Sequence, residues 1–437
     1  MSGATPASKR PESTTPAAAS LTIVLERAIV KSWKSPIAFG IFAIVAVVLF
    51  GVFGRPGVSH FRLSTSADLI QLPDLNLPTE ATGWVLSIVL VVFAAFAAWR
   101  VHRARKVPLW LTILYVALFL VGFLTWASAD ALIPVPGLLV GAVSLSVPLI
   151  FGALSGVICE RSGVINIAIE GQLLAGAFMS AVVASITGQP FLGLLAAMVA
   201  GVLVSFVLAA FAINYIVDQI IVGVVLNVLV AGLTGFLYSQ VLTDNSQLLN
   251  SPPRFDRIDI PLLGQIPIIG PVLFNQTVIV YIMYGVVAIV AYALFNTRWG
   301  LRTRSVGEHP QAADTVGIKV NVMRFWNVSL AGAIAGLGGA YFTLGSVGLF
   351  TKEMTAGAGF IALAAVIFGQ WDPIKATLAG LLFGFATNLQ SVLGIIGSPV
   401  PSQFMLMLPY VVTIFAVAGL VGVSRAPAAD GKPYIKS

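Results

Sequence analysis

Long, uninterrupted apolar runs are the feature that most constrains this chain. A bilayer's hydrocarbon core takes about 20 helical residues to cross, and lipid leaves backbone groups no water partner, so an apolar run of this length must be helical. Charged residues make up 9% of the chain, against about a quarter in soluble domains. We therefore predict an all-α, polytopic transmembrane helical bundle. Twelve apolar segments lie at about 36–53, 84–99, 108–127, 138–158, 164–186, 190–212, 219–241, 277–295, 325–345, 357–370, 374–393 and 403–423.

Several of these segments are shorter than a full span needs. The 357–370 segment in particular has the length of a re-entrant segment or of half a broken helix. The prediction is therefore about 10–12 spans.

Basic residues predict the orientation of the bundle. If the N-terminus is cytoplasmic and every segment crosses, 19 of the 24 lysines and arginines fall on the inside. Basic residues accumulate in cytoplasmic loops, so both termini are expected in the cytoplasm. The same rule explains the net charge of +7, and the lipid bilayer, with no nucleic acid, is the expected partner.

The sequence shows no motif or cluster of residues that is typical of a catalytic site. The Gly-x-x-x-x-Gly-Lys pattern that cradles nucleotide phosphates is absent. His60, His102 and His309 are far apart, which argues against a metal site, and Ser155 has no evident histidine partner. We expect a protein that is not an enzyme and uses no cofactor.

The polar segment 296–324 contains a short helix. His309–Pro310 begins it, with proline at the first helical position, and Gly317 ends it. A helix this short is not stable alone. Two interpretations stay open: a simple helical turn in a loop, or an element that docks on another protein.

The 152–178 stretch places polar groups inside an apolar segment. Asn166 and Glu170 lie four residues apart and are expected on one face of a helix. An ionisable group within the membrane marks either a transport path or a buried structural partner, and both interpretations stay open here.

The 329–373 stretch combines small residues with a polar break. Ala331, Ala335 and Gly339 recur at helical spacing, which is typical of close packing between membrane helices. The following TKEMTAGAGF, residues 351–360, is polar and glycine-rich, and irregular backbone at this depth is tolerated where it lines a cavity or is covered by protein. Its side chains Lys352, Glu353 and Thr355 are candidates for the substrate-entry side.

Three motifs together resemble the bacterial ABC-transporter permeases of the branched-chain amino acid and simple-sugar superfamily. They are ERSGVINIAIEGQLLAGAF (160–178), RSVGEHPQAADTVGIKV (304–320) and FTKEMTAGAGFIALAAVIFGQWDP (350–373). The resemblance covers about 140–425 and is nearest to the nucleoside-type permeases that work with basic-membrane lipoproteins.

The resemblance implies the permease subunit of an ATP-driven importer that translocates a nucleoside or simple sugar by alternating access. Its partners would be ABC ATPase subunits, a second permease that is a paralogue, and an extracytoplasmic solute-binding lipoprotein. The alternative is a secondary transporter driven by an ion gradient. The resemblance also implies a coupling helix near 307–318, with the candidate residues Gly307, Glu308, His309, Pro310, Ala312, Ala313 and Gly317. Our candidates for the translocation path are Asn166, Glu170, Glu353, Thr355 and Phe360, and the match of Asn166 and Glu170 to a family motif leaves open whether they contact the solute.

These features predict four regions. Residues 1–35 would be a disordered and partly amphipathic cytoplasmic segment, and 36–135 would hold the first spans and an outer loop. Residues 136–424 would form the permease core, and 425–437 a cytoplasmic tail. The expected location is the bacterial plasma (inner) membrane.

Overall fold

A computed structural model describes residues 33–436, apart from 67, 398–399, 402, 405–406 and 408–424. Two expected elements lie outside the described residues. They are the N-terminal segment up to residue 32 and most of the last predicted span, 403–423.

Within the described residues, ten helices are long and apolar enough to cross a membrane. They coincide with ten of the predicted segments, which confirms a polytopic helical bundle. The spans are α1 (Lys34–Ala46), α2 (Thr79–His102), α3 (Leu109–Ala127), α4 (Val135–Arg161), α5 (Ile169–Thr187), α6 (Pro190–Ala209), α7 (Gln219–Leu237), α9 (Val278–Asn296), α12 (Val320–Ala340) and α14 (Pro373–Ile395).

Short elements connect these spans, and π-helical turns extend several of them. The short helices are α8 (Ser246–Leu249), α10 (Arg298–Glu308), α11 (Pro310–Thr315) and α13 (Ala358–Phe368). The π-helical turns are Val47–Val52, Ala210–Asn214, Tyr238–Leu242, Gly270–Phe274 and Tyr341–Val347. The strands are β1 (Val58–Arg62), β2 (Leu75–Pro78), β3 (Leu132–Pro134), β4 (Arg257–Asp259) and β5 (Asn275–Thr277).

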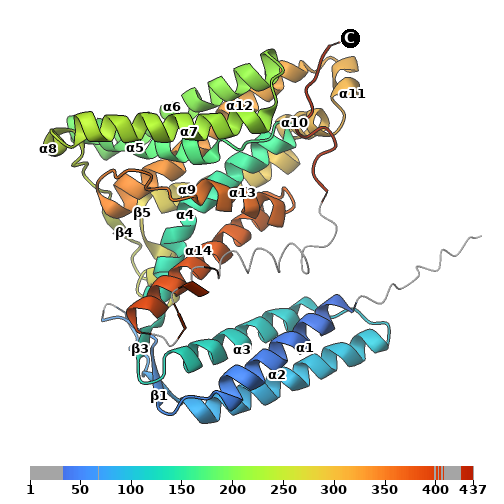
Figure 1. Ribbon diagram of the computed structural model, residues 1–437, viewed down its shortest axis with the longest axis vertical. Coiled ribbons are helices and arrows are strands. Elements are labelled where there is room, and N and C mark those ends of the chain that lie inside the picture. The colour runs from blue at the N-terminus through green and yellow to red at the C-terminus, as the bar shows by residue number, and fades with distance from the viewer. Residues whose placement is uncertain are drawn as a thin grey trace, which may run out of the picture.

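The segments that connect the spans lie at two opposite ends of the bundle (Figure 1). The strands and α8 lie at one end, here called the strand end. The helices α10 and α11 and the C-terminal residues lie at the other, here called the basic end. The predicted cytoplasmic segment 296–324 therefore shares its end with the C-terminal residues, and the two long predicted outer loops share the opposite end. The cytoplasmic placement of the basic end remains a prediction.

The first three spans form a layer of their own beside the rest of the bundle (Figure 1). Their shared core includes Phe50, Leu90 and Tyr115, and Leu389 and Leu393 of α14 pack into the same cluster. The Tyr115 hydroxyl donates to the carbonyl of Phe39 at 2.7 Å, so this layer is tied together by a buried polar bond as well as by apolar packing.

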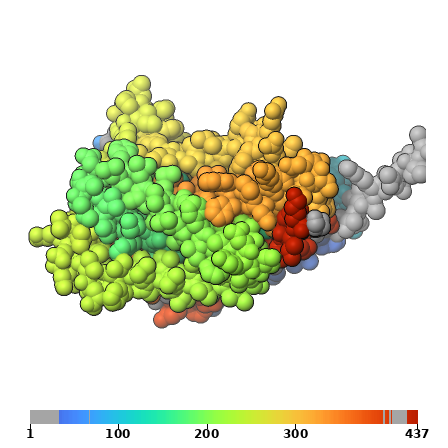
Figure 2. Space-filling view, turned by 90° about the horizontal axis from the view of Figure 1, so that it is seen from above, coloured from blue at the N-terminus to red at the C-terminus, as the bar shows by residue number. Residues whose placement is uncertain are grey.

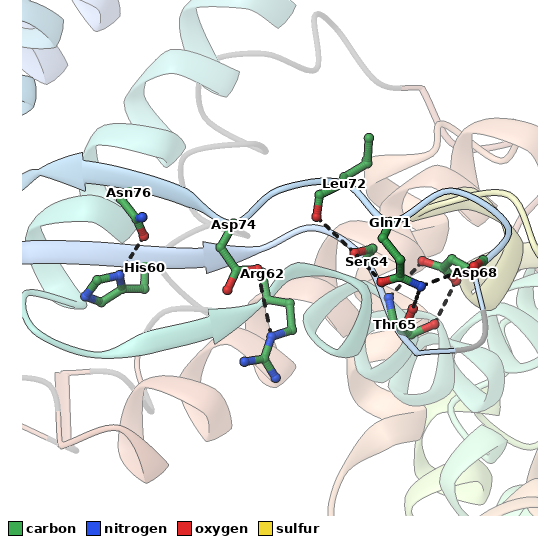
Figure 3. Close-up of polar contacts among 9 residues, drawn as sticks. All are labelled: His60, Arg62, Ser64, Thr65, Asp68, Gln71, Leu72, Asp74 and Asn76. Atoms are coloured by element: carbon green, nitrogen blue, oxygen red, sulfur yellow. Dashed lines mark hydrogen bonds and ion pairs between the residues drawn. The ribbon is translucent and has the colours of Figure 1, made fainter.

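The loop of this layer at the strand end is built from β-pairing and side-chain caps. Strand β1 pairs with β2 antiparallel and with β3 in parallel. Between β1 and β2, Asp68 accepts from the backbone N–H and the hydroxyl of Thr65, and Gln71 donates to the Thr65 carbonyl (Figure 3). The backbone N–H of Leu69 donates to the carbonyl of Gln265, so the two long loops at this end contact each other.

The core of the remaining bundle is organised around α12, in whose span an apolar stretch of 18 residues is 83% buried. This helix packs against α4, α5 and α6. A Cβ at Gly339 would overlap the carbonyl of Leu173, and one at Gly336 would overlap that of Ala197. The predicted close approach of helix backbones is therefore confirmed at Gly339, and Gly336 provides a second such contact.

Candidate functional site

The segment before α13 re-enters the bundle and leaves α13 as half a span. The helix α13 has 11 residues, about 16 Å at 1.5 Å per residue, against a hydrocarbon core of about 30 Å. An added Cβ at Gly152 of α4 would meet Ala362, and one at Gly156 would meet Val366. The two helices therefore run in the same direction, and α13 accompanies only the basic-end part of α4. This is the broken-helix alternative predicted for 357–370.

A carboxylate holds the beginning of this half-helix. Glu170 lies in the first turn of α5. Its Oε1 accepts from the Thr355 hydroxyl at 2.6 Å and from the Gly357 N–H at 2.9 Å, and its Oε2 accepts from the Gly359 N–H at 2.6 Å. The N-termini of α5 and α13 thus meet at one negative charge, which both helix dipoles stabilise.

Glycine makes this close contact possible. A Cβ at Gly359 would overlap the backbone of Glu170. Gly357 has φ +84°, in the left-handed region that favours glycine. The glycine-rich character of 351–360 therefore has a physical cause, since the loop must turn sharply and approach α5 without side chains between them.

Asn166 lies elsewhere, and the expectation that it shares a helix face with Glu170 is wrong. The helix α5 begins at Ile169, so Asn166 belongs to the turn before it. Its fully buried amide bonds to the hydroxyl of Ser155 and to the amide of Gln172, which in turn donates to Ser205. The chain turns here before α5, and the network satisfies the buried side-chain amides of Asn166 and Gln172.

Asn227 is a site residue that the sequence analysis missed. Its Oδ1 accepts from the N–H of Gly171 at 2.8 Å, and its amide donates to the carbonyl of Ile167 at 2.9 Å. One side chain of α7 thereby satisfies backbone groups at the start of α5. A single asparagine within the apolar run 219–241 was the available signal.

Four of the five candidate path residues line one cavity of about 340 Å³. Glu170, Glu353, Thr355 and Phe360 contribute to it together with Asn227, whereas Asn166 does not. The Phe360 side chain is 51% exposed, so the cavity opens at the surface of the chain. A second cavity, of about 280 Å³, shares Thr355 and Ala356 with it and is lined largely by apolar groups. The re-entrant loop therefore separates two hollows in the bundle.

The basic end carries two consecutive short helices. The predicted helix is α11, which begins at Pro310 in the first helical position and is followed by Gly317 at φ +85°. The preceding α10 was expected to be loop. Thr297 caps it by accepting from the Gly300 N–H, and Gly300, Thr303, Val306 and Gly307 form its buried side. Because only these few residues face the bundle, α10 shows no long apolar pattern in the sequence.

The seven candidate coupling residues divide into two groups. Gly307, Pro310 and Ala313 are buried, and a Cβ at Gly307 would overlap the carbonyl of Arg161 at the end of α4. The other four face outward: Glu308, His309, Ala312 and Gly317. Two large apolar side chains are also exposed here: Leu301 of α10 at 62%, and Val316, directly after α11, at 76%.

Comparisons with known proteins give significant matches over about two thirds of the chain. The guanosine ABC transporter permease protein NupQ of Bacillus subtilis is 44% identical over 302 residues, covering 66% of this chain and 93% of NupQ. The nucleoside ABC transporter permease protein NupC of Lactococcus lactis is 44% identical over 301 residues, covering 67% of this chain and 94% of NupC.

A more distant relative is a second guanosine permease of the same Bacillus. NupP is 25% identical over 286 residues, covering 63% of this chain and 81% of NupP. No solved structure gives a significant match.

The family model described as the permease component of the branched-chain amino acid transport system matches residues 138–417. The match starts after α3, so the first three spans precede it. It confirms the resemblance carried by the three sequence motifs: the chain belongs to this family of transport-system permease components.

Proposed function

We propose that the chain is the membrane-spanning permease subunit of an ATP-binding-cassette importer for nucleosides. The observation that carries the proposal is 44% identity to NupQ and NupC over 93% and 94% of their lengths. Both are permease proteins of transporters named for guanosine or nucleosides. The chain is accordingly a multi-pass protein of the bacterial plasma membrane.

The proposed path runs through the cavity beside the re-entrant loop. Glu353, Thr355 and Phe360 line it, and Glu353 and Phe360 offer an exposed carboxylate and an exposed ring to a polar, aromatic solute. Glu170 acts there by holding the half-helix α13, because it accepts hydrogen bonds from Thr355, Gly357 and Gly359. Asn166 supports the path indirectly, through the buried turn before α5.

In this proposal, the energy for transport comes from partner ATPases that contact the outward side of α10 and α11. Glu308, His309, Ala312 and Gly317 would face the ATPase, while Gly307, Pro310 and Ala313 seat the helices on the bundle. Movement of the helix pair would be transmitted directly to α4 through the close contact between Gly307 and Arg161. Alternating access would follow as the spans move around the half-helix.

Further partners follow from the same relatives. Bacillus subtilis has two guanosine permease proteins, NupQ and NupP, and we propose a paralogous second permease here as well. An extracytoplasmic solute-binding lipoprotein would deliver substrate at the strand end. Residues 36–135 would be an addition to a permease core of 136–424, and the basic end would face the cytoplasm.

Affinity purification of the tagged chain in mild detergent tests this assembly. An ATP-binding-cassette subunit and a second permease should co-purify in stoichiometric amounts. The variant Ala312→Glu, which changes an exposed position, should release the ATPase and retain the second permease. Isolation of the chain without either partner, from membranes that contain both, would count against the proposal and favour the ion-driven alternative.

A further inference from the structure

The C-terminal residues 425–436, here called the strap, lie against the basic end of the bundle. In Figure 1 they run beside α10 and α11, and Figure 2 shows them as a red strip at the surface next to the orange part of the chain. Ala429 is 5% and Tyr434 8% exposed. A segment that is expected to be a simple tail therefore has buried side chains of its own.

One arginine connects the strap to two spans. Arg324, in the first turns of α12, is 2% exposed. Its Nε donates to the carbonyl of Ser162, directly after α4, at 3.1 Å, and its Nη1 donates to the carbonyl of Lys432 at 2.8 Å. A planar guanidinium can hold several acceptors in fixed directions. Arg324 thus joins α12, the end of α4 and the strap at a single buried point.

The fit around this arginine is close. A Cβ at Gly163 would lie 2.6 Å from Nη2 of Arg324 and 3.1 Å from the carbonyl of Ala429. A Cβ at Gly431 would lie 2.7 Å from Ile165. The turn after α4 and the strap therefore approach each other through glycines on both sides.

The strap also holds both coupling helices. The N–H of Ala429 donates to the carbonyl of Gly307 at 2.9 Å, and the N–H of Ala428 donates to Glu308 at 3.1 Å. The ring of Tyr434 belongs to a small apolar cluster with Val306, Ala313 and Val320. That cluster contains one residue each from α10, α11, α12 and the strap.

We infer that the strap is a working part of the coupling apparatus, binding α10 and α11 to α4 and α12 so that all four move as one body. The inference rests on the proposed function, which assigns α10 and α11 to the ATPase contact. Without the strap, α11 would keep its short connections to α10 and α12 but lose the Tyr434 ring from the cluster that seats it. Motion of the ATPase would then reach the spans only through the contact of α10 with α4, and less of that motion would be transmitted.

Tyr434 and its neighbour Ile435 provide a matched pair of variants, since Ile435 is 69% exposed. In proteoliposomes that hold the complete transporter, Tyr434→Ala should lower substrate uptake at least fivefold while ATP hydrolysis continues. The ratio of ATP hydrolysed to solute moved should rise accordingly. Tyr434→Phe, which keeps the ring, should restore most uptake, and Ile435→Ala should behave as wild type.

Three results would overturn the inference, and they separate it from the proposed function. Normal uptake with a normal coupling ratio in Tyr434→Ala would overturn the inference alone. Loss of the ATPase from purified Tyr434→Ala complexes, in proportion to lost uptake, would make the strap a docking surface instead. A wild-type complex without ATP-dependent uptake would overturn the proposed function and the inference together.

A cross-link tests whether the strap and α11 move together. Lys436 Nζ lies 3.8 Å from Asp314 of α11, with both side chains partly or largely exposed. Asp314→Cys with Lys436→Cys removes a surface ion pair of little energetic value, and the native Cys159 is fully buried. Uptake should persist after the two thiols are joined by a short cross-linker. Reversible loss of uptake on cross-linking would show a strap that must release, and would overturn the inference.

Discussion

Replacement of Glu170 by glutamine tests the contact between α5 and α13 in quantitative terms. The amide oxygen can keep the bonds from Thr355 and Gly357, but as neutral bonds, each weaker by about 1 kcal/mol than a bond to a charged group. The Gly359 N–H then faces an NH₂ group and is left unsatisfied, at a cost of about 1–3 kcal/mol. We expect a total loss of about 3–5 kcal/mol, roughly a 100- to 3,000-fold change in the docking equilibrium of α13.

Reversible unfolding of the purified chain in mixed detergent and SDS micelles measures this loss. The matched control is Glu353→Gln, which removes a charge from an exposed side chain in the same cavity and should change the free energy of unfolding by no more than about 0.5 kcal/mol. A loss for Glu170→Gln near 0.6 kcal/mol, the average for a hydrogen bond between membrane helices, would refute the account of Glu170 as the group that holds the half-helix.

Three further predictions concern the coupling helices, the buried network and the strap. Ala312→Glu should abolish uptake at normal membrane abundance, whereas Ala313→Glu, at a buried position, should lower abundance on immunoblots as well. Asn166→Ala should destabilise the chain by about 2–4 kcal/mol in the same unfolding assay, since it leaves buried polar partners unsatisfied; an unchanged midpoint would contradict the network. Burial raises the pKa of Asp430 to about 7, far above its ordinary range. The docked strap therefore binds a proton that the released strap does not between about pH 4 and 7, so docking should weaken as pH rises through this window and level off above it. The mobility of a spin label at Ile435→Cys should rise with pH over the same window. The variant Asp430→Asn should remove this pH dependence, although the groups that face Asp430 stay in place: Glu160 and Cys159 of α4 and Arg324 of α12. An identical pH profile in Asp430→Asn would contradict the assignment to Asp430.

The spans and the short helix α11 were predictable because their signals are local. Apolar runs of membrane length placed ten spans, and Pro310 with Gly317 marked the limits of α11. The broken helix at 357–370 was indicated by its length and by the glycines before it. In each case the determining residues lie within about one element of the chain, where composition and spacing suffice.

The contacts that organise the sites join residues far apart in the sequence. Glu170 meets Thr355 across 185 positions, and Arg324 meets Lys432 across 108. Hydropathy carries no information on which distant loop a carboxylate or guanidinium will reach. The same limit explains the misplacement of Asn166, because helical spacing does not show that this residue precedes α5 and bonds to Ser155 and Gln172.

The central claim is that this permease works with partner ATPases, and the energy source of uptake tests it most directly. Proteoliposomes that contain the chain with its co-purified partners should accumulate labelled guanosine only when ATP is present at the ATPase side. A protonophore should leave that uptake unchanged. Uptake that continues without ATP and collapses with the protonophore would contradict the claim.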